Sequence, residues 1–310
     1  MPRAALLRAA RRAALTSGAA LAAGSAALTS CADAPSLVTD WSSPEKAKQL
    51  EVSYQRAEVR AQRAAMIAML RPETGERILD VGCGPGYLVA QLAAAVGPEG
   101  RVEGVDPSEA MVRMARARAT AEAAASSAVH VGPGEAGALP YPDATFDAVV
   151  LSQVLLYVPD VPAALREARR VLRPGGRLLI CETDWDSLIV HTDDVPRLEK
   201  IRAAAVTTFL DAHLPPRLPG LLHEAGLALG EASTVPMLSA GVALPESFMG
   251  HWAFHVAAEK ARAAGMDERD VAGWLQEQQD RSRDGAFFAC VHRFLFLAWR
   301  PPRDGAETKP

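Results

Sequence analysis

Apolar and polar positions follow two different periods along this chain, and together they predict an ordered series of strands and helices. Short apolar runs bounded by Gly or Pro predict buried strands, and longer segments with apolar residues three and four apart predict helices. The predicted strands cover residues 77–81, 102–105, 128–131, 146–151, 177–181, 228–235 and 286–299. The predicted helices cover residues 44–70, 87–96, 107 or 108 to 125, 162–172, 194–213, 217–225, 245–264 and 267–282.

This order of elements predicts the fold class. Strands alternate with helices from residue 77 to residue 181, which is typical of βαβ units with right-handed crossovers. We therefore expect an α/β fold with a doubly wound Rossmann-like sheet that is mostly parallel and has one antiparallel C-terminal strand. The helical segment at about 240–285 interrupts the last two strands and predicts a helical lid. Residues 36–310 would form one domain.

Residues 1–35 are interpreted separately, as a signal-like or disordered extension. Residues 1–32 contain four arginines and no acid, and residues 13–32 carry no charge. The adjacent arginines and the ending Leu28-Thr29-Ser30-Cys31 resemble a twin-arginine signal with a lipoprotein cleavage box. The uncharged stretch is mostly Ala, Ser, Thr and Gly, so no stable membrane span is expected. The alternative is an Ala-rich extension without a targeting role.

Composition excludes several classes of protein. The chain is 49% hydrophobic and 23% charged, which is too apolar for a disordered chain. Its net charge of −4 does not favour a nucleic acid partner, which needs clustered Lys and Arg. Four dispersed cysteines, Cys31, Cys83, Cys181 and Cys290, do not fit a disulfide scaffold or a zinc cluster. We expect a globular protein with a small-molecule partner and no metal.

A glycine-rich turn, Asp80-Val81-Gly82-Cys83-Gly84-Pro85-Gly86, lies between the first predicted strand and its helix. Glycines there let the backbone approach a ligand closely, and the helix N-terminus favours polar or anionic groups. The dinucleotide fingerprint needs its third glycine at position 87, where this chain has Tyr. The turn therefore argues against a nicotinamide cofactor.

Four segments in order carry a family resemblance. They are residues 78–86, residues 104–108 (Gly-Val-Asp-Pro-Ser), residues 138–143 with Phe146-Asp147, and residues 172–176 (Leu-Arg-Pro-Gly-Gly). Together they resemble the class I S-adenosylmethionine (AdoMet) dependent methyltransferases, in the branch of the ubiquinone/menaquinone biosynthesis methyltransferases (methyltransferase type 11). The resemblance implies AdoMet as cofactor and O- or C-methylation of a small organic acceptor, such as a quinone-like or aromatic natural product. The alternative is a catalytically silent AdoMet-fold binding protein or an exported lipoprotein.

The resemblance also implies which residues hold the cofactor. Asp80 and the glycine loop would hold the methionine part, and Asp106 would accept the ribose hydroxyls. Glu135 stands where the family usually has Asp beside the adenine. The full implied set is Asp80, Gly82, Cys83, Gly84, Pro85, Gly86, Asp106, Pro107, Glu135, Ala136, Ser152 and Gln153.

Candidate residues for the acceptor side follow from position. Asp184 and Trp185 come after the fifth strand, at the sheet edge where ligands of such folds bind. We consider Asp184, His251 and His255 as catalytic candidates. Tyr54, Trp185 and Trp252 are candidate substrate contacts, although Trp252 could equally be a core residue.

Two further alternatives concern a metal site and the compartment. The acidic segment from Glu182 to Asp194 could bind a metal, but helix caps and loops explain such residues more simply. Because AdoMet is a cytosolic metabolite, we expect a cytoplasmic protein, with the exported lipoprotein as the alternative. The acceptor atom, a general base and the oligomeric state are left open.

Overall fold

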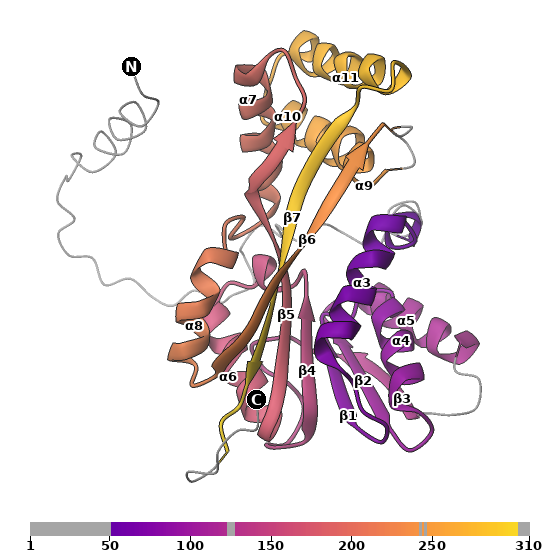
Figure 1. The fold of residues 1–310 in the computed structure, drawn as a ribbon, viewed down its shortest axis with the longest axis vertical. Coiled ribbons are helices and arrows are strands. Elements are labelled where there is room, and N and C mark those ends of the chain that lie inside the picture. The colour runs from indigo at the N-terminus through magenta and orange to yellow at the C-terminus, as the bar shows by residue number, and fades with distance from the viewer. Residues whose placement is uncertain (1–50, 123–127, 242–243, 245–246, 303–310) are drawn as a thin grey trace, which may run out of the picture. The chain divides into compact units, whose positions relative to one another are not determined.

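The computed structural model describes residues 51–122, 128–241, 244 and 247–302 (Figure 1). The chain divides into two compact units, Met1–Ser36 and Leu37–Pro310, and every described residue belongs to the second. The extension proposed for residues 1–35 therefore lies outside the described residues. No helix of the described part is long and apolar enough to cross a membrane.

Seven strands form one sheet in the order β3-β2-β1-β4-β5-β7-β6. Strands β1 to β5 are parallel to one another, and β7 runs antiparallel to both β5 and β6. The strand bounds are Arg77–Val81 (β1), Arg101–Asp106 (β2), Ala128–Pro133 (β3), Phe146–Ser152 (β4), Leu172–Val190 (β5), Ala228–Ala240 (β6) and Phe288–Trp299 (β7). This arrangement confirms the predicted Rossmann-like sheet with one antiparallel strand.

Helices cover both faces of the sheet, as Figure 1 shows. The α-helices of the described part are α3 (Ala57–Leu70), α4 (Tyr87–Val96), α5 (Glu109–Glu122), α6 (Val161–Val171), α7 (Val195–Ala205), α8 (Leu218–Glu224), α9 (Phe248–His251), α10 (Ala258–Ala263) and α11 (Glu268–Arg283). Shorter helical segments are η1 (Leu155–Tyr157), η2 (Val206–Thr208), η3 (Pro215–Arg217) and the π-helix η5 (Trp252–Ala257).

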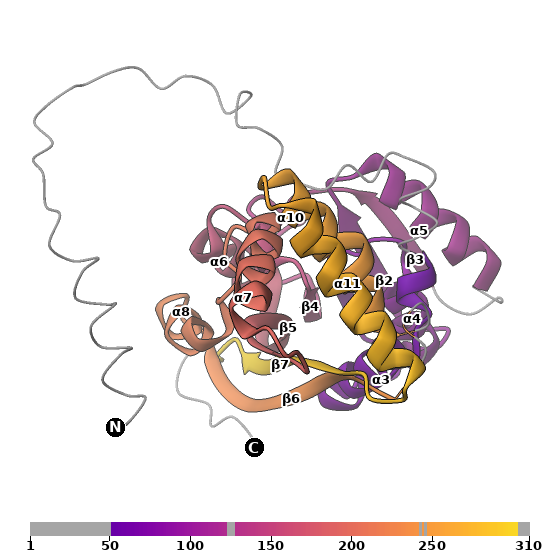
Figure 2. The same cartoon turned by 90° about the horizontal axis from the view of Figure 1, so that it is seen from above.

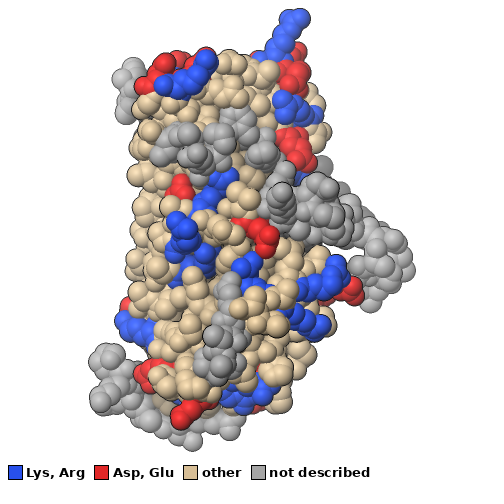
Figure 3. Space-filling view, turned by 90° about the vertical axis from the view of Figure 1, so that its right-hand side faces the viewer, with Lys and Arg blue, Asp and Glu red and all other residues tan. Residues whose placement is uncertain are grey.

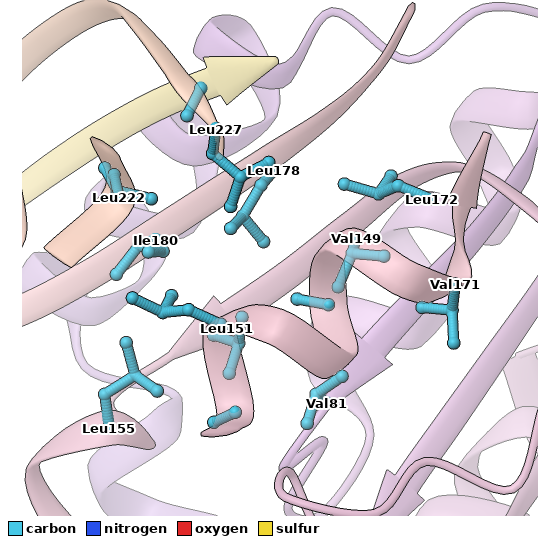
Figure 4. Close-up of a cluster of buried hydrophobic side chains, with 14 of the residues drawn as sticks. Val81, Val149, Leu151, Leu155, Val171, Leu172, Leu178, Ile180, Leu222 and Leu227 are labelled. Carbon is cyan, nitrogen blue, oxygen red and sulfur yellow. The ribbon is translucent and has the colours of Figure 1, made fainter. Parts of the chain in front are cut away.

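The lower part of the sheet, where all seven strands run side by side, has a hydrophobic core on each face. One core packs α6 and α8 against side chains such as Leu151 and Ile180 (Figure 4). The other packs α3, α4 and α5 against the opposite face, with Ile78 and Leu179 among its members. Because both faces are covered, strands β1 and β4 are almost entirely buried, which explains their continuous apolar runs.

Strand β5 is much longer than the predicted strand at 177–181. It begins at Leu172, which pairs with Phe146, and the predicted turn at 174–176 is an irregularity within it before Arg177 pairs with Ala148. Beyond Cys181 the strand continues to Val190 because β7 pairs with it along most of that length. Polar residues from 182 to 187 read as a loop in the sequence, but pairing with a distant strand makes them a strand.

The long strands carry a second core, which we call the upper lobe. It consists of α7, η2, α9, η5, α10 and α11, packed against residues 185–190 of β5, 236–240 of β6 and 288–292 of β7. Figures 1 and 2 show these helices gathered around the strand ends. Of these helices, α9, η5, α10 and α11 occupy the segment predicted as a lid at about 240–285, and α7 and η2 come from an earlier part of the chain. They enclose a buried core of their own, and any closing motion remains a prediction.

Three predicted helices differ from the structure. In the segment 44–70, Arg56 is extended and separates a helical stretch at 51–54 from α3, and residues 44–50 lie outside the described part. The helix expected at 194–213 ends as α7 and η2, where the Thr207 hydroxyl bonds back to the Ala204 carbonyl oxygen at 2.7 Å. The helix expected at 245–264 contains the π-helix η5, which changes the spacing of side chains along it.

Candidate active site

The turn after β1 is held in a conformation that requires glycine. Gly82, Gly84 and Gly86 have φ values of +69°, +52° and +83°, in the left-handed region. The backbone N–H groups of Gly82 and Cys83 donate to the Val105 carbonyl oxygen at 2.7 and 3.0 Å, which fastens the turn to the end of β2. A Cβ on Gly84 would lie 3.2 Å from the Tyr54 hydroxyl oxygen, so little room remains for a side chain.

Two acids stand at the ends of neighbouring strands beside this turn. Asp80 on β1 is 2% exposed and Asp106 at the end of β2 is 8% exposed. The Asp106 carboxylate accepts hydrogen bonds from the backbone N–H groups of Gly84 (2.9 Å) and Ser108 (2.8 Å). Neither acid forms an ion pair with a described residue, so two buried carboxylates lie together without a neutralising cation.

Without a nearby cation, the ionised forms of these two acids are destabilised by burial. Burial and the nearby charge of Asp106 raise the pKa of Asp80 to about 8. Burial also raises the pKa of Asp106, although its two backbone hydrogen bonds oppose that rise. A positively charged ligand group beside Asp80 would remove this penalty.

Tyr54 lies over the turn from the segment before α3. The Tyr54 ring stacks on the Tyr87 ring with centroids 5.6 Å apart. The Cζ atom of Arg118 lies over the Tyr87 ring, 3.4 Å from its centroid. Burial raises the pKa of Tyr54 to about 12, and Asp106 and Asp80 add to that rise whereas Arg293 opposes it. The Tyr54 hydroxyl is therefore close to the cofactor turn and also within the field of Arg293.

The end of β4 forms the next wall of the site. Ser152 accepts a hydrogen bond from the Gln62 side-chain amide at 3.2 Å. Gln153 has a left-handed backbone (φ +58°), and its side chain bridges the Cys181 carbonyl oxygen (3.0 Å) and the Thr183 hydroxyl (2.6 Å). A non-glycine residue with this φ costs energy and persists only where its surroundings hold it, which is typical of ligand sites.

Comparison with known proteins identifies the family. A family model described as a methyltransferase domain matches residues 79–180. A 37.1 kDa protein of transposon Tn4556 from Streptomyces fradiae is 34% identical over 264 residues, which cover 84% of this chain and 72% of that protein. The chain belongs to the class I AdoMet-dependent methyltransferases.

Named enzymes match a shorter part of this methyltransferase. The 2-phytyl-1,4-naphthoquinone methyltransferase of Synechococcus elongatus is 43% identical over 35% of this chain. The demethylmenaquinone methyltransferase of Symbiobacterium thermophilum is 40% identical over 37% of it. In each case the match spans 46% of the enzyme, so this chain aligns with less than half of either relative.

Solved structures agree on the fold. A methyltransferase structure from Bacillus halodurans aligns with a TM-score of 0.54 at 17% identity, covering 78% of this chain and 99% of that one. Phosphoethanolamine N-methyltransferase 2 of Haemonchus contortus, solved with AdoMet, aligns with a TM-score of 0.56 at 18% identity, covering 86% of this chain and 59% of that one. At these identities the likeness establishes the fold alone.

The cofactor of the methyltransferase is AdoMet, and the residues present fit it. AdoMet carries an ammonium and a sulfonium, and Asp80 and Asp106 supply buried negative charge with no cation among the described residues. Asp106 still has lone pairs for ribose hydroxyls after its two backbone bonds. The glycine turn supplies close backbone approach. We therefore expect Asp80 and the turn to hold the methionine part and Asp106 the ribose.

The other implied cofactor residues fall into two groups. Cys83 packs into the α3–α5 core, and burial raises the pKa of its thiol, so its backbone rather than its sulfur faces the turn. Pro85 is buried and its carbonyl oxygen accepts from Arg118 Nε at 3.0 Å. Pro107 and Glu135 are exposed and Ala136 is half-buried. Their adenine contacts remain predictions.

The three catalytic candidates are not gathered at the cofactor turn. Asp184 is buried and its carboxylate bonds His213 Nδ1 at 2.7 Å and the Asp186 backbone N–H at 3.0 Å. This contact raises the pKa of His213. His251 ends α9 and is half-buried, and the side chain of His255 lies outside the described residues. Sequence reasoning did not single out His213, because the pair joins positions far apart in the chain.

The candidate substrate tryptophans lie in the core of the upper lobe. Trp185 stacks on Phe209 and on Trp252, with centroids 5.3 Å apart in both pairs. Both indole N–H groups are buried and have no hydrogen-bond partner among the described residues, and the same holds for that of Trp274. The spacing of Phe248, Trp252, His255 and Glu259 in the sequence is that of one α-helical face, but a π-helix intervenes, and Trp252 is buried while Glu259 is exposed.

The acidic segment after β5 caps and pairs within the protein. Asp194 accepts from the Arg197 backbone N–H at 3.0 Å as the N-cap of α7, and Asp193 pairs with Arg281 at 2.7 Å. In the described part of the chain no group of three or more Cys, His, Asp and Glu side chains gathers as a metal site.

Two buried charges at the site were not singled out from the sequence. Glu182 is fully buried, and one carboxylate oxygen accepts the backbone N–H groups of Val154 (2.9 Å) and Leu155 (2.7 Å). The other oxygen, Oε2, has no hydrogen-bond partner in the part of the chain that the structure describes, and burial raises the pKa of Glu182 to about 8. Arg293 is buried on β7. A lone arginine between His292 and Phe294 in an otherwise apolar strand was the available signal.

Proposed function

We propose that this methyltransferase transfers the methyl group of AdoMet to a small, planar, quinone-like or aromatic acceptor, at oxygen or carbon. The observation that carries the activity is the pair of buried, unneutralised carboxylates of Asp80 and Asp106 beside the left-handed glycine turn. The acceptor class is supported by the aromatic side chains above that turn and by the quinone methyltransferases among the relatives.

The chain's own residues have a limited task in such a reaction. AdoMet supplies a methyl group that is already activated for in-line displacement. The protein must bind the donor, orient the acceptor and exclude water. Asp80, Asp106 and the glycine turn would bind the donor, and Tyr54 would close over it. The half-buried Tyr157 and Phe209 rings, with centroids 5.4 Å apart, offer apolar surface suited to a planar ring.

Partners and compartment are parts of the same proposal. The side of the molecule on which Figure 1 draws α3 carries Lys and Arg separated by uncharged residues and interrupted by acids, in its described part (Figure 3). That distribution favours a small-molecule acceptor over nucleic acid. We place the enzyme in the cytoplasm, where AdoMet is made. Fractionation of cells expressing the tagged full chain tests this, and a lipid-modified protein in the membrane fraction would support the exported alternative.

The decisive experiment is binding and turnover by the full chain. Calorimetry should detect binding of AdoMet or of its demethylated product S-adenosylhomocysteine (AdoHcy). Asp106→Ala should weaken it at least tenfold, because two charge-assisted hydrogen bonds to the ribose are lost. Methyl transfer from labelled AdoMet is then measured with reduced naphthoquinones and phenols as acceptors. Binding without transfer to any acceptor would favour a silent binding protein, and unchanged affinity in Asp106→Ala would contradict the ribose assignment.

A further inference from the structure

Arg293 lies at the junction between the lower core and the upper lobe. On β7 it pairs with Thr183 of β5 and Val235 of β6. Two residues further along β7, Leu295 packs into the α3–α5 core, and two residues earlier Val291 packs into the upper lobe. Because side chains alternate along a strand, Arg293 shares the face of these two residues and points toward the space between the two cores.

The guanidinium of Arg293 has only neutral partners among the described residues. Its Nε–H donates to the Thr183 hydroxyl at 3.3 Å, and an Nη1–H donates to the Gln62 side-chain carbonyl oxygen. Its Cζ lies 4.8 Å from the centroid of the Phe248 ring. No carboxylate in the described part of the chain approaches within ion-pair distance, and Arg293 is 7% exposed. Its remaining N–H groups have no partner there.

A buried, unpaired cation is unusual because desolvation of the charge is not repaid. Arginines removed from water are normally paired with an acid, as the half-buried Arg177 is with Glu76 at 2.7 Å in this chain. The charge of Glu182 acts on Arg293 without forming an ion pair, and the Glu182 Oε1 is already held by two backbone N–H groups. A purely structural link between α3 and β7 would need only a neutral hydrogen-bonding side chain.

The surroundings of Arg293 belong to the site of methyl transfer. Its charge acts on the hydroxyls of Tyr54 and Tyr157 and on Cys181. Tyr54 is also the residue that lies over Gly84 of the cofactor turn. Gln62, which accepts from Arg293, donates to Ser152 at the end of β4. One chain of contacts therefore links Arg293 to Ser152, which belongs to the implied cofactor set, and its charge also reaches Tyr54 above the cofactor turn.

We infer that Arg293 binds an anionic oxygen of the methyl acceptor, and this inference rests on the proposed function. Such an oxygen would be a carboxylate substituent or an ionised ring hydroxyl. A guanidinium recognises either, and an aromatic acceptor would stack beside Phe248 and Tyr157 while its anion pairs with Arg293. Arg293 would then select acidic aromatic acceptors over neutral ones of the same shape.

Binding of three probes to the AdoHcy-loaded full chain tests this. The probes are 1-hydroxy-2-naphthoate (a carboxylate), 2-hydroxy-1,4-naphthoquinone (an ionised ring hydroxyl) and the neutral 2-methoxy-1,4-naphthoquinone. We expect wild type to bind at least one anionic probe at least tenfold more tightly than the neutral one. The preferred probe identifies the source of the anion. Arg293→Met should remove the preference and leave the neutral probe within about twofold.

Two further variants control for folding and charge. Arg293→Gln keeps a hydrogen-bond donor toward Thr183 without the charge, so it should lose the anion preference even if Arg293→Met folds poorly. Arg202→Met makes the same change in net charge at an exposed pair with Asp186 and should leave the preference intact. Equal affinity for all three probes in wild type, no binding of any, or an intact preference in both Arg293 variants would overturn the inference. AdoHcy binding with those results spares the proposed function, whereas a wild type that binds no AdoHcy contradicts both.

Discussion

The lower half of the molecule and the upper lobe share strands β5, β6 and β7, but they are organised by different parts of the chain. In the lower half the cofactor turn depends on the backbone: three left-handed glycines, N–H groups on the Val105 carbonyl oxygen, and two acids at strand ends. In the upper lobe side chains do the organising, with the stacked Trp185 and Trp252 at the centre.

Because of this difference, the two halves should tolerate different substitutions. Backbone geometry at the turn suits one constant ligand, because any Cβ added to Gly82 or Gly86 would lie under 3.0 Å from Val154 or Ala115. Side-chain packing in the upper lobe can be altered one residue at a time while the strands remain. If the proposed function holds, main-chain conformation specifies the donor site and side-chain packing shapes the acceptor side, so the two halves should respond differently to substitution.

The largest effect we expect is on stability, from Trp274→Ala. Trp274 is fully buried in the upper lobe, so its loss should lower the free energy of unfolding by about 3–5 kcal/mol. AdoHcy affinity at low temperature should stay within about twofold of wild type, since Trp274 lies in the other core. Thermal unfolding followed by circular dichroism and calorimetry checks both.

The same experiment tests whether the two halves are independent. Because β5 and β7 pass through both cores, Trp274→Ala should still melt in one transition. Phe288→Ala, at an exposed aromatic of the same lobe, is the matched control and should cost less than about 1 kcal/mol. Two separate melting steps would show that the lobe is an independent unit.

The next effect concerns the backbone of the lower half. Gly84→Val should weaken AdoHcy binding more than about a hundredfold, since φ is +52° and the added atoms meet Tyr54. Gly220→Val on α8, where a Cβ would meet nothing within 4 Å, serves as the control and should leave binding unchanged. Retained affinity in a folded Gly84→Val protein would remove the argument from main-chain conformation.

The smallest effect is the pH dependence of stability. Burial raises the pKa of both Asp80 and Glu182 to about 8, above their values in the unfolded chain. The folded protein therefore holds protons that the unfolded chain has released, and the stability this gives is lost as pH rises through 8. Between pH 6 and pH 9 the melting temperature of the ligand-free protein should fall by several degrees and then level off once both acids are ionised in the folded protein.

Matched variants separate these acids from the rest of the chain. Asp80→Asn with Glu182→Gln should flatten the dependence by at least half, and Glu182→Gln keeps an oxygen for the Val154 and Leu155 N–H groups. Glu99→Gln, at an exposed turn position, should leave the fall unchanged. An equal fall in the double variant would show that other groups cause it.

Local patterns predicted the lower half well and the upper lobe poorly, for a physical reason. The strand–turn–helix around Asp80 and Gly84 and the acid at Asp106 are set by residues close together in the chain, so their pattern is readable. The position of Arg293 in the site depends on its hydrogen bonds to Thr183 and Gln62, which lie 110 and 231 positions away in the sequence. The length of β5 likewise depends on pairing with β7, which no local pattern reports.

For some residues, burial in the structure distinguishes a core residue from a site residue where the residue type alone does not. Trp252 fits both a substrate contact and a core residue by sequence, and only the packing against Trp185 and Trp274 places it in the core. The sequence shows Asp184 as an acid at the sheet edge with no evident partner, but it bonds His213, which lies beyond α7 and η2 in a segment whose pattern predicted helix. Long-range partners, rather than residue types, separate these alternatives.

Beyond the register shift between Leu229 and Glu231, β6 and β7 pair without interruption, from Glu231 opposite Leu297 to Ala240 opposite Phe288, and this stretch restricts how the two strands can change in length. One extra residue in either strand would turn buried Met237 or Val291 outward and bring exposed Leu238 inward. Insertions should therefore survive in pairs of residues, each pair lifting the lobe by about 7 Å. Among relatives, the distance between the cofactor turn and the upper lobe would then change in discrete steps rather than gradually.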